Sequence, residues 1–164
     1  MINGNRVIRF VWPLFLCLLI TSCTGGSPTV KLGINNSMLA TCPASPNCVS
    51  SDVADADHHI EPFQLAGSPV EVWQMTKTLV AALPRTKIIT VESNYLHAEC
   101  RSSLFGFVDD LELHLRPEEK MMAVRSAARL GYADFGVNRK RVERLRSELL
   151  KNGVIESSSG RITP

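Results

Sequence analysis

The sequence predicts an α+β domain, in which an antiparallel four-stranded sheet carries two helices packed on one face. Three observations predict this fold: a capped amphipathic helix, four strand-like runs joined by short connections, and a second amphipathic helix near the end of the chain. Short connections favour antiparallel pairing of successive strands. Two helices on one face of such a sheet make two layers around one core, and a length of 164 residues suits a single domain.

The first helix is expected over residues 69–83, because its start carries three consecutive signals. Ser68 can cap the helix, Pro69 suits the first helical position, and Glu71 completes a capping box. Apolar residues then recur at helical spacing until Pro84 ends the helix.

Four strands are expected over residues 87–92, 95–101, 107–115 and 121–128, where apolar and polar side chains alternate. The polar face of this sheet is expected to lie in solvent, with charges of opposite sign on neighbouring strands. In the alternative interpretation this face is a polar binding surface. Its side chains are His97, Glu99, Arg101, Asp110, Glu112, His114 and Arg125.

The second helix is expected to begin with Asn138 as its N-cap and to end near Gly153, a glycine suited to the position after a helix. The densest polar cluster of the sequence surrounds its start and is the candidate ligand-binding site. The members are Arg125, Arg129, Asp134, Asn138 and Arg139, with Asn47 and Ser50 from an N-terminal turn. Helix N-termini attract anions, and arginines bind carboxylate or phosphate groups through paired hydrogen bonds. In the alternative interpretation the arginines pair with neighbouring aspartates and only fix the loop.

The chain begins with a leader typical of exported proteins. Arg6 and Arg9 precede an apolar run over residues 10–20. This run is too short to cross a bilayer as a helix, which needs about 20 residues. Residues 1–22 are therefore predicted to be a signal peptide that is removed on export.

The leader ends in Ile20-Thr21-Ser22-Cys23, which resembles the lipobox of bacterial lipoproteins. The resemblance implies that cleavage follows Ser22, that Cys23 carries a diacylglycerol, and that its new amine is acylated. Several acyl chains hold a protein on a membrane far better than one. Thr24 gives no inner-membrane retention signal, so the resemblance places the protein on the outer membrane, facing the periplasm. In the alternative interpretation the leader is an ordinary signal peptide and Cys23 stays a plain thiol.

Composition predicts how the rest of the chain is organised. Residues 23–41 are rich in Gly, Ser and Asn and are expected to form a flexible tether. Residues 42–155 are expected to form the single folded domain, and residues 156–164 a disordered tail.

Export would place the remaining cysteines in an oxidising compartment, where disulfides persist. Cys42 and Cys48 flank a segment with two prolines and an asparagine, which favour turns. Because a turn can bring two cysteines within disulfide range, a Cys42–Cys48 bond is predicted. In the alternative interpretation the domain is a thiol-dependent enzyme or a hydrolase that uses Cys48 or Ser50. Acidic neighbours of Cys48 argue against a reactive thiol, and Cys100 is expected to be buried.

The charge pattern argues against nucleic-acid binding. Without the leader the chain has 16 basic and 16 acidic side chains and is formally neutral. The net charge is negative from Thr24 to Glu119 and positive from Lys120 to Pro164. This asymmetry indicates either a basic patch for an anionic partner or two halves that pair across the fold. His58 and His59 lie among acidic residues, but the sequence has no strong metal-ligand spacing and no Gly-x-Ser-x-Gly elbow of a hydrolase. No catalytic residue, metal or cofactor is therefore predicted.

Three stretches together resemble the family called domain of unknown function 1499. They are residues 42–51 (CPASPNCVSS), 104–112 (LFGFVDDLE) and 124–139 (VRSAARLGYADFGVNR). The resemblance covers about residues 40–151 and implies a single α+β domain, with no established reaction or ligand. The sequence thus predicts a membrane-anchored periplasmic lipoprotein with a non-catalytic binding or envelope-accessory domain. Its expected partners are the membrane, through the lipid, and an envelope protein or a small anionic ligand.

Overall fold

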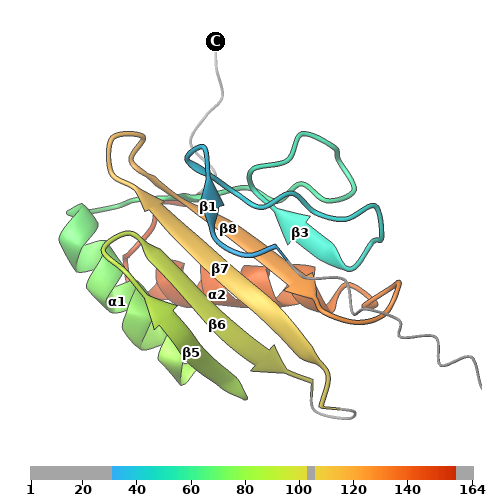
Figure 1. Cartoon of the computed structure of the whole chain (residues 1–164). Helices are drawn as coiled ribbons and strands as arrows, with labels where there is room; N and C mark the ends of the chain where they lie inside the picture. The colour runs from blue at the N-terminus through green and yellow to red at the C-terminus, as the bar shows by residue number, and fades with distance from the viewer. Residues whose placement is uncertain (1–30, 103–105, 158–164) are drawn as a thin grey trace, which may run out of the picture.

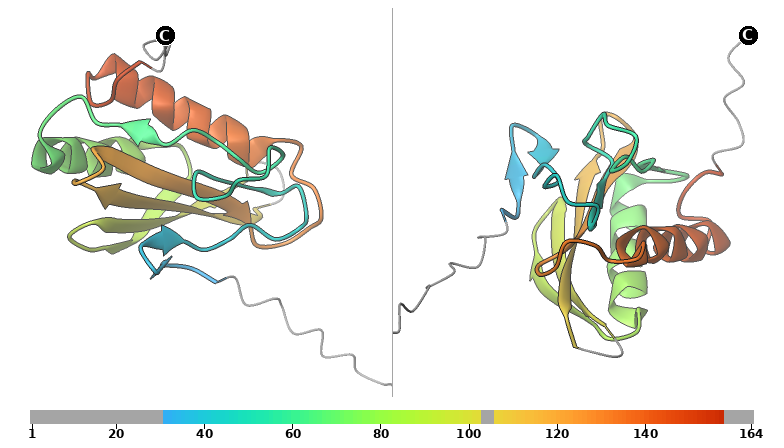
Figure 2. Two further views of the ribbon diagram at one scale, coloured as in Figure 1. Left: turned by 90° about the horizontal axis from the view of Figure 1, so that it is seen from above. Right: turned by 90° about the vertical axis from the view of Figure 1, so that its right-hand side faces the viewer.

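The fold is given by a computed structural model, which describes residues 31–102 and 106–157. A twisted sheet forms the middle layer (Figure 1). Two helices cover one face of the sheet, and a small hairpin lies on the other (Figure 2). The predicted α+β class is therefore confirmed, and the hairpin layer is an addition that the sequence did not predict.

Four long antiparallel strands occupy the positions that the alternating runs predict, to within one residue at each end. The first two are β5 (Thr86–Val91) and β6 (Tyr95–Arg101). The next two are β7 (Val108–Arg116) and β8 (Met121–Ala128). Successive strands of this set pair with one another, as their short connections favour.

The prediction of a four-stranded sheet is wrong, because two short strands extend the sheet beyond β8. The six strands follow the order β3–β8–β7–β6–β5, and β4 also pairs with β8. β3 (Cys48–Ser50) lies along one end of β8, and β4 (Phe63–Gln64) lies along the other. Strands of three and two residues are too short to show an alternating pattern. They nevertheless supply hydrogen-bond partners to an edge that would otherwise be unpaired.

The first helix, α1 (Pro69–Ala82), begins as predicted. Ser68 Oγ accepts a hydrogen bond from the Glu71 N–H at 3.5 Å, as an N-cap does. The helix ends at Ala82, and the C-cap residue Leu83, which precedes Pro84, donates its N–H to the Val80 carbonyl. Local signals alone were enough to place this element.

The second helix, α2 (Val137–Lys151), begins two residues earlier than the predicted N-cap implies. Its N-cap is Gly136, so the prediction of Asn138 as N-cap is wrong. Asn138 instead lies within the first turn, where its side chain is buried. Gly153 follows the helix with φ of 66°, which confirms the expected glycine after the C-terminus.

The hydrophobic core lies between the helices and the sheet. Both helices contribute one stripe, and the long strands contribute every second side chain. The largest fully buried apolar side chains are Phe63, Leu96, Leu111, Leu113, Met122, Leu145 and Leu149. Within the described part of the chain, no helix is both long and apolar enough to cross a bilayer.

The polar face of the sheet is also covered, so the expectation that it lies in solvent is wrong. The hairpin of β1 (Ile34–Asn35) and β2 (Met38–Leu39) lies on this side of the sheet (Figure 2). Leu39 packs against Tyr95 and Ala123 in a small second core. The buried polar side chains of this face are His97, Asp110, Glu112, His114 and Arg125, whereas Glu99 is half-buried and Arg101 is exposed.

The hairpin also bears on where the folded domain begins. It falls within residues 23–41, the stretch expected to be a tether, so regular structure starts before residue 42. The Gly33 N–H donates to Glu112 Oε1 at 2.6 Å, which joins this segment to the polar face of the sheet.

Candidate functional site

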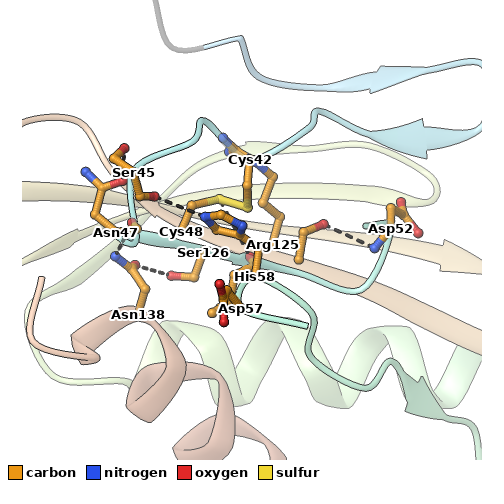
Figure 3. The surroundings of a disulfide bond; sticks show 12 residues. Cys42, Ser45, Asn47, Cys48, Asp52, Asp57, His58, Arg125, Ser126 and Asn138 are labelled. Atoms are coloured by element: carbon orange, nitrogen blue, oxygen red, sulfur yellow. Dashed lines mark hydrogen bonds between the residues drawn. A yellow bond between two sulfur atoms is a disulfide. The ribbon is translucent and has the colours of Figure 1, made fainter. Parts of the chain in front are cut away.

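The loop closed by Cys42 and Cys48 forms one wall of the candidate site (Figure 3). The predicted disulfide is present, with the two Cα atoms 5.6 Å apart. Asn47, inside the loop, is buried, and its Nδ2 donates to the Gly131 carbonyl at 2.5 Å. Its own carbonyl accepts from the Ala128 N–H at 2.9 Å. The disulfide loop is therefore fixed to the end of β8.

Asn138 ties the same loop to α2. Its Nδ2 donates to the Asn47 carbonyl at 3.0 Å, and its Oδ1 accepts from Ser126 Oγ at 2.6 Å (Figure 3). These groups are buried, where each needs a hydrogen-bond partner. Asn138 thus positions the loop, β8 and α2 relative to one another.

The helix N-terminus expected to attract an anionic ligand is already occupied by Asp134. Its carboxylate accepts hydrogen bonds from the N–H groups of Gly136 and Asn138, both at 2.8 Å. These are donors that an α-helix leaves unsatisfied at its start. Because the chain supplies its own carboxylate here, a ligand has to bind elsewhere.

A cleft of about 400 Å³ lies between the disulfide loop and the end of β8. Its volume falls within the range typical of small-molecule sites. Arg125 and Arg129 line it from β8 and the segment after it, and Lys31 lines it from the start of the described chain. The apolar part of the lining is formed by Cys42, Pro43, Ala127, Ala128 and Leu130.

Arg125 is 3% exposed although it lines the cleft. Its Nη1 donates to Glu112 Oε2 at 2.7 Å, but its buried Nε has no acceptor among the described residues. A buried donor without an acceptor costs about 1–3 kcal/mol. The guanidinium therefore has one edge bound by the protein and another that still needs an acceptor.

Glu112 makes no hydrogen bond to this Nε, and its oxygens bind other donors. Oε1 accepts from the Tyr95 hydroxyl at 2.7 Å and from the Gly33 N–H at 2.6 Å, while Oε2 accepts from Arg125. Burial, and then the charge of Glu112, raise the pKa of Tyr95, so the hydroxyl keeps its proton and donates. Among the described residues none supplies an acceptor for Arg125 Nε, and the cleft that Arg125 lines is the adjacent space in which a ligand could supply one.

Arg129 is held by two carboxylates. Its Nε and Nη2 donate to both oxygens of Asp110, at 2.9 and 2.7 Å, and Nη2 also donates to Glu99 at 2.8 Å. This is the arginine–aspartate pairing that the alternative interpretation predicts. Burial alone would raise the pKa of Asp110, but hydrogen bonds from His97 and Arg129 lower it below its ordinary value. The pair with Asp110 in turn raises the pKa of Arg129, so both stay ionised.

Three of the seven expected ligand-site residues line the cleft: Asn47, Arg125 and Arg129. The other four do not line it. Asp134 and Asn138 make the structural contacts described above. Ser50 is fully buried, and its Oγ accepts from the Asp52 N–H at 3.2 Å. Arg139 donates to the Asp57 carbonyl at 3.0 Å.

Lys31 and Thr41 are among the residues that line the cleft but were not predicted from the sequence. Both lie in the stretch expected to be a tether. The only local signal was the charge of Lys31, which stands alone in a neutral segment.

The residues considered for catalysis have structural partners. Cys48 is in the disulfide and is buried, so its sulfur forms no thiolate. Cys100 is free and buried as predicted, and burial raises the pKa of its thiol. A set of three or more His, Cys, Asp or Glu side chains placed to hold a metal is not found within residues 31–102 and 106–157.

His58 lies beside the disulfide loop (Figure 3). Its Nδ1 is 2.6 Å from Asp55 Oδ1, and its Nε2 is 3.2 Å from the Ser45 carbonyl oxygen. The hydrogen bond with Asp55 raises the pKa of His58, and the Ser45 carbonyl adds to this effect. The histidine therefore acts as a charge-dependent brace for the loop.

The leader, Cys23 and the C-terminal segment 158–164 lie outside the described residues. Lipid attachment at Cys23 and the expected disorder of the tail therefore remain predictions.

Comparison with known proteins agrees with the motifs of the sequence. A family model described as "Protein of unknown function (DUF1499)" matches residues 38–149. No curated protein matches the chain, and no solved structure matches it. The matched region contains the disulfide loop, the whole sheet, α1 and nearly all of α2. Since the match covers more than half of the sequence, the chain belongs to the DUF1499 family.

Proposed function

We propose that this protein is a lipoprotein of the cell envelope whose folded domain binds a small anionic ligand without transforming it. The single observation that carries ligand binding is the buried Nε of Arg125, a donor that has no acceptor within residues 31–102 and 106–157, in a side chain that lines a cleft of about 400 Å³. A carboxylate or phosphate oxygen is the acceptor that an arginine binds most strongly.

The rest of the cleft supports the same ligand class. Lys31 is exposed at the cleft, where its charge favours an anion. Arg129 has its positive charge balanced by Asp110 and Glu99, so it shapes the wall more than it attracts the ligand. Pro43 and Leu130 give the cleft an apolar surface. A small anion that also carries an apolar group fits this combination.

Binding is supported over catalysis by the contacts of the candidate nucleophiles. Cys48 is oxidised, and Ser50 is fully buried with its Oγ bound to the Asp52 N–H. Neither side chain lines the cleft. A hydrolase or thiol-dependent enzyme would need a nucleophile that reaches its substrate.

The test of ligand binding observes Arg125 directly. The Nε–H signal of Arg125 in a nitrogen-15 NMR spectrum of the full chain is followed while inorganic phosphate or acetate is added. We expect this signal to shift in a saturable manner with at least one probe, because the anion becomes its acceptor. A signal that stays unchanged up to millimolar probe, in a folded protein, contradicts the proposal.

Two variants serve as a matched pair for this titration. Lys31→Ala removes a charge at the cleft and should weaken probe binding several-fold. Arg139 lies outside the cleft, where its guanidinium donates to the Asp57 carbonyl. Arg139→Ala therefore removes a charge of the same sign without changing the cleft, and probe binding should not change. Equal effects of the two substitutions would show that the probes respond to overall charge rather than to the cleft.

The lipid anchor rests on the leader and on the Ile20-Thr21-Ser22-Cys23 motif. The test is the intact mass of the protein extracted from membranes of the cells that make it. We expect loss of residues 1–22 and a gain equal to a diacylglycerol plus one further acyl chain, with recovery in the outer-membrane fraction. Cys23→Ala should abolish the lipid. An unmodified chain recovered from cytosol overturns the anchor.

A further inference from the structure

One end of the molecule exposes several large apolar side chains. This end holds the start of β7 and the end of β8, since Asp109 pairs with Ala128. The loop between β8 and α2 lies here (Figure 1). The exposed apolar side chains are Phe107 at 51%, Leu130 at 58%, Tyr132 at 75%, Phe135 at 91% and Val137 at 42%. Single exposed apolar residues are common on soluble domains, but a group of this size marks an interaction surface.

Phe135 contributes little to the packing of the domain. Its φ of 54° is a left-handed conformation, which a bulky residue rarely adopts. Asp134 stabilises this backbone, because its carboxylate accepts hydrogen bonds from the N–H groups of Gly136, the N-cap of α2, and Asn138 in its first turn. The loop therefore exposes an aromatic ring to solvent, at a left-handed backbone position that bulky side chains rarely occupy.

A basic cavity adjoins the apolar side chains. It has a volume of about 340 Å³, and Val137 and Ser102 connect it to the exposed group. Its basic lining residues are Arg85, Arg101, Lys140, Arg141 and Arg144. Arg141 is paired with Asp109 at 2.6 Å, but no acidic side chain of the described chain lines the cavity. We call the exposed apolar group together with Arg85, Lys140 and Arg144 the aromatic–basic tip.

The chain also enters the domain beside this tip. Lys31, the first described residue, lines the same cleft as Leu130 and Gly131. Cys23, the proposed lipid site, is eight residues before Lys31. Eight residues span at most about 28 Å when fully extended. A lipid on Cys23 would therefore hold this end of the domain, rather than the opposite end, close to the bilayer.

We propose that the aromatic–basic tip docks on the anionic surface of the lipid bilayer that carries the anchor. This inference rests on the proposed lipid attachment at Cys23. Aromatic side chains favour the boundary between headgroups and acyl chains, where their apolar rings are shielded from water. Basic side chains are attracted to anionic headgroups, and the cavity lined by Arg85, Lys140 and Arg144 can receive a phosphate group. The anchor and the tip then hold the domain in one orientation on the membrane.

The experiment compares two exposed apolar positions at opposite ends of the domain. Phe135→Cys places a thiol at the tip. Val70→Cys places one at the start of α1, where Val70 is 71% exposed and lies near Leu115 at the other end of β7. Each full-length variant is labelled with an environment-sensitive fluorophore. It is then reconstituted in vesicles of phosphatidylethanolamine and phosphatidylglycerol. Cys100 is buried, and Cys42 and Cys48 are joined in the disulfide. Within the described residues, the introduced cysteine is therefore the thiol that the fluorophore labels.

The tip label should be quenched by lipids that carry a nitroxide, and its quenching by aqueous iodide should be several-fold weaker than at position 70. Lys140→Glu combined with Arg144→Glu should remove much of this protection. The effect of this double substitution should be small in phosphatidylcholine vesicles, because it depends on anionic headgroups.

Each other outcome overturns the inference in a way that identifies the error. Equal iodide quenching at positions 135 and 70 in vesicle-bound protein shows that the tip faces water, while the anchor stands. Protection in native membranes but not in protein-free vesicles identifies a protein partner in place of lipid. Recovery of the chain apart from the vesicles overturns the anchor and the docking together, and the Arg125 titration remains a separate test of the cleft.

Discussion

Glu112 is a carboxylate in the middle of a sheet with no exposed surface, and its three hydrogen bonds explain how the fold tolerates it. The Tyr95 hydroxyl, the Gly33 N–H and Arg125 Nη1 all donate to its oxygens. Taking a charge out of water is unfavourable unless such partners replace the lost hydration. The stability of this face therefore depends on keeping the ion pair complete.

We expect Glu112→Gln to lower the free energy of unfolding by about 3 kcal/mol, because Arg125 would keep its buried charge without a counter-charge. Urea denaturation of the full chain, followed by circular dichroism, measures this difference. Glu99→Gln is the matched control. Glu99 pairs with Arg129 in a partly solvent-accessible position, and ion pairs in contact with solvent contribute no more than about 1 kcal/mol. Similar losses in the two variants would contradict the role given to burial.

The sequence predicted which face carries these polar residues but not that this face is covered. Alternation correctly separates His97, Glu112 and Arg125 from the apolar side chains of the same strands. Their burial depends on residues 31–41, which have a loop-like composition and show no strand pattern. For the same reason the candidate site was only partly predicted, since Lys31 and Thr41 complete the cleft from that segment.

At the scale of elements, long patterned segments were predictable and short ones were not. Both helices and the four long strands follow local periodicity and capping signals. β3 and β4 form only because β8 offers them an edge, which is a property of the assembled sheet. The start of α2 was misplaced because Gly136, without a capping side chain, is a weaker signal than Asn138.

The disulfide loop is the element whose removal has the clearest consequence. The Cys42→Ser, Cys48→Ser double variant should lose about 2 kcal/mol of unfolding free energy, because a closed loop of this length restricts the unfolded chain. It should also bind the anionic probes more weakly, since Cys42 and Pro43 line the cleft. Thermal denaturation with and without a reductant measures the stability effect.

The double variant carries its own control. Reductant should destabilise the wild-type chain to the level of the variant and leave the variant itself unchanged. A further loss in the variant would mean that the reductant acts elsewhere, and no loss in the wild-type chain would mean that the bond does not stabilise this loop.

At the scale of the whole molecule, two histidines respond to pH in opposite directions. The hydrogen bond with Asp55 raises the pKa of His58 above its ordinary value of 6.5. Burial, and then the charge of Arg116, lower the pKa of His114 below the same value. His58 therefore stabilises the fold below pH 6.5, and its contribution is lost as pH rises through its raised pKa. The contribution of neutral His114 is present above pH 6.5 and is lost as pH falls through its lowered pKa.

These opposite signs predict a melting temperature that is highest near pH 6.5 and falls on both sides within the range where the histidines titrate. His58→Asn should flatten the alkaline side and leave the acidic side unchanged, whereas His114→Asn should do the reverse. The variants are compared by the slope of melting temperature against pH rather than by the melting temperature itself, because either substitution also removes packing contacts of the imidazole ring. Asp55→Asn provides the control, since it keeps the imidazole but removes the carboxylate whose hydrogen bond raises the pKa of His58. If the alkaline slope survives in both His58→Asn and Asp55→Asn, another group controls it and the brace at the disulfide loop is not the pH-sensitive contact.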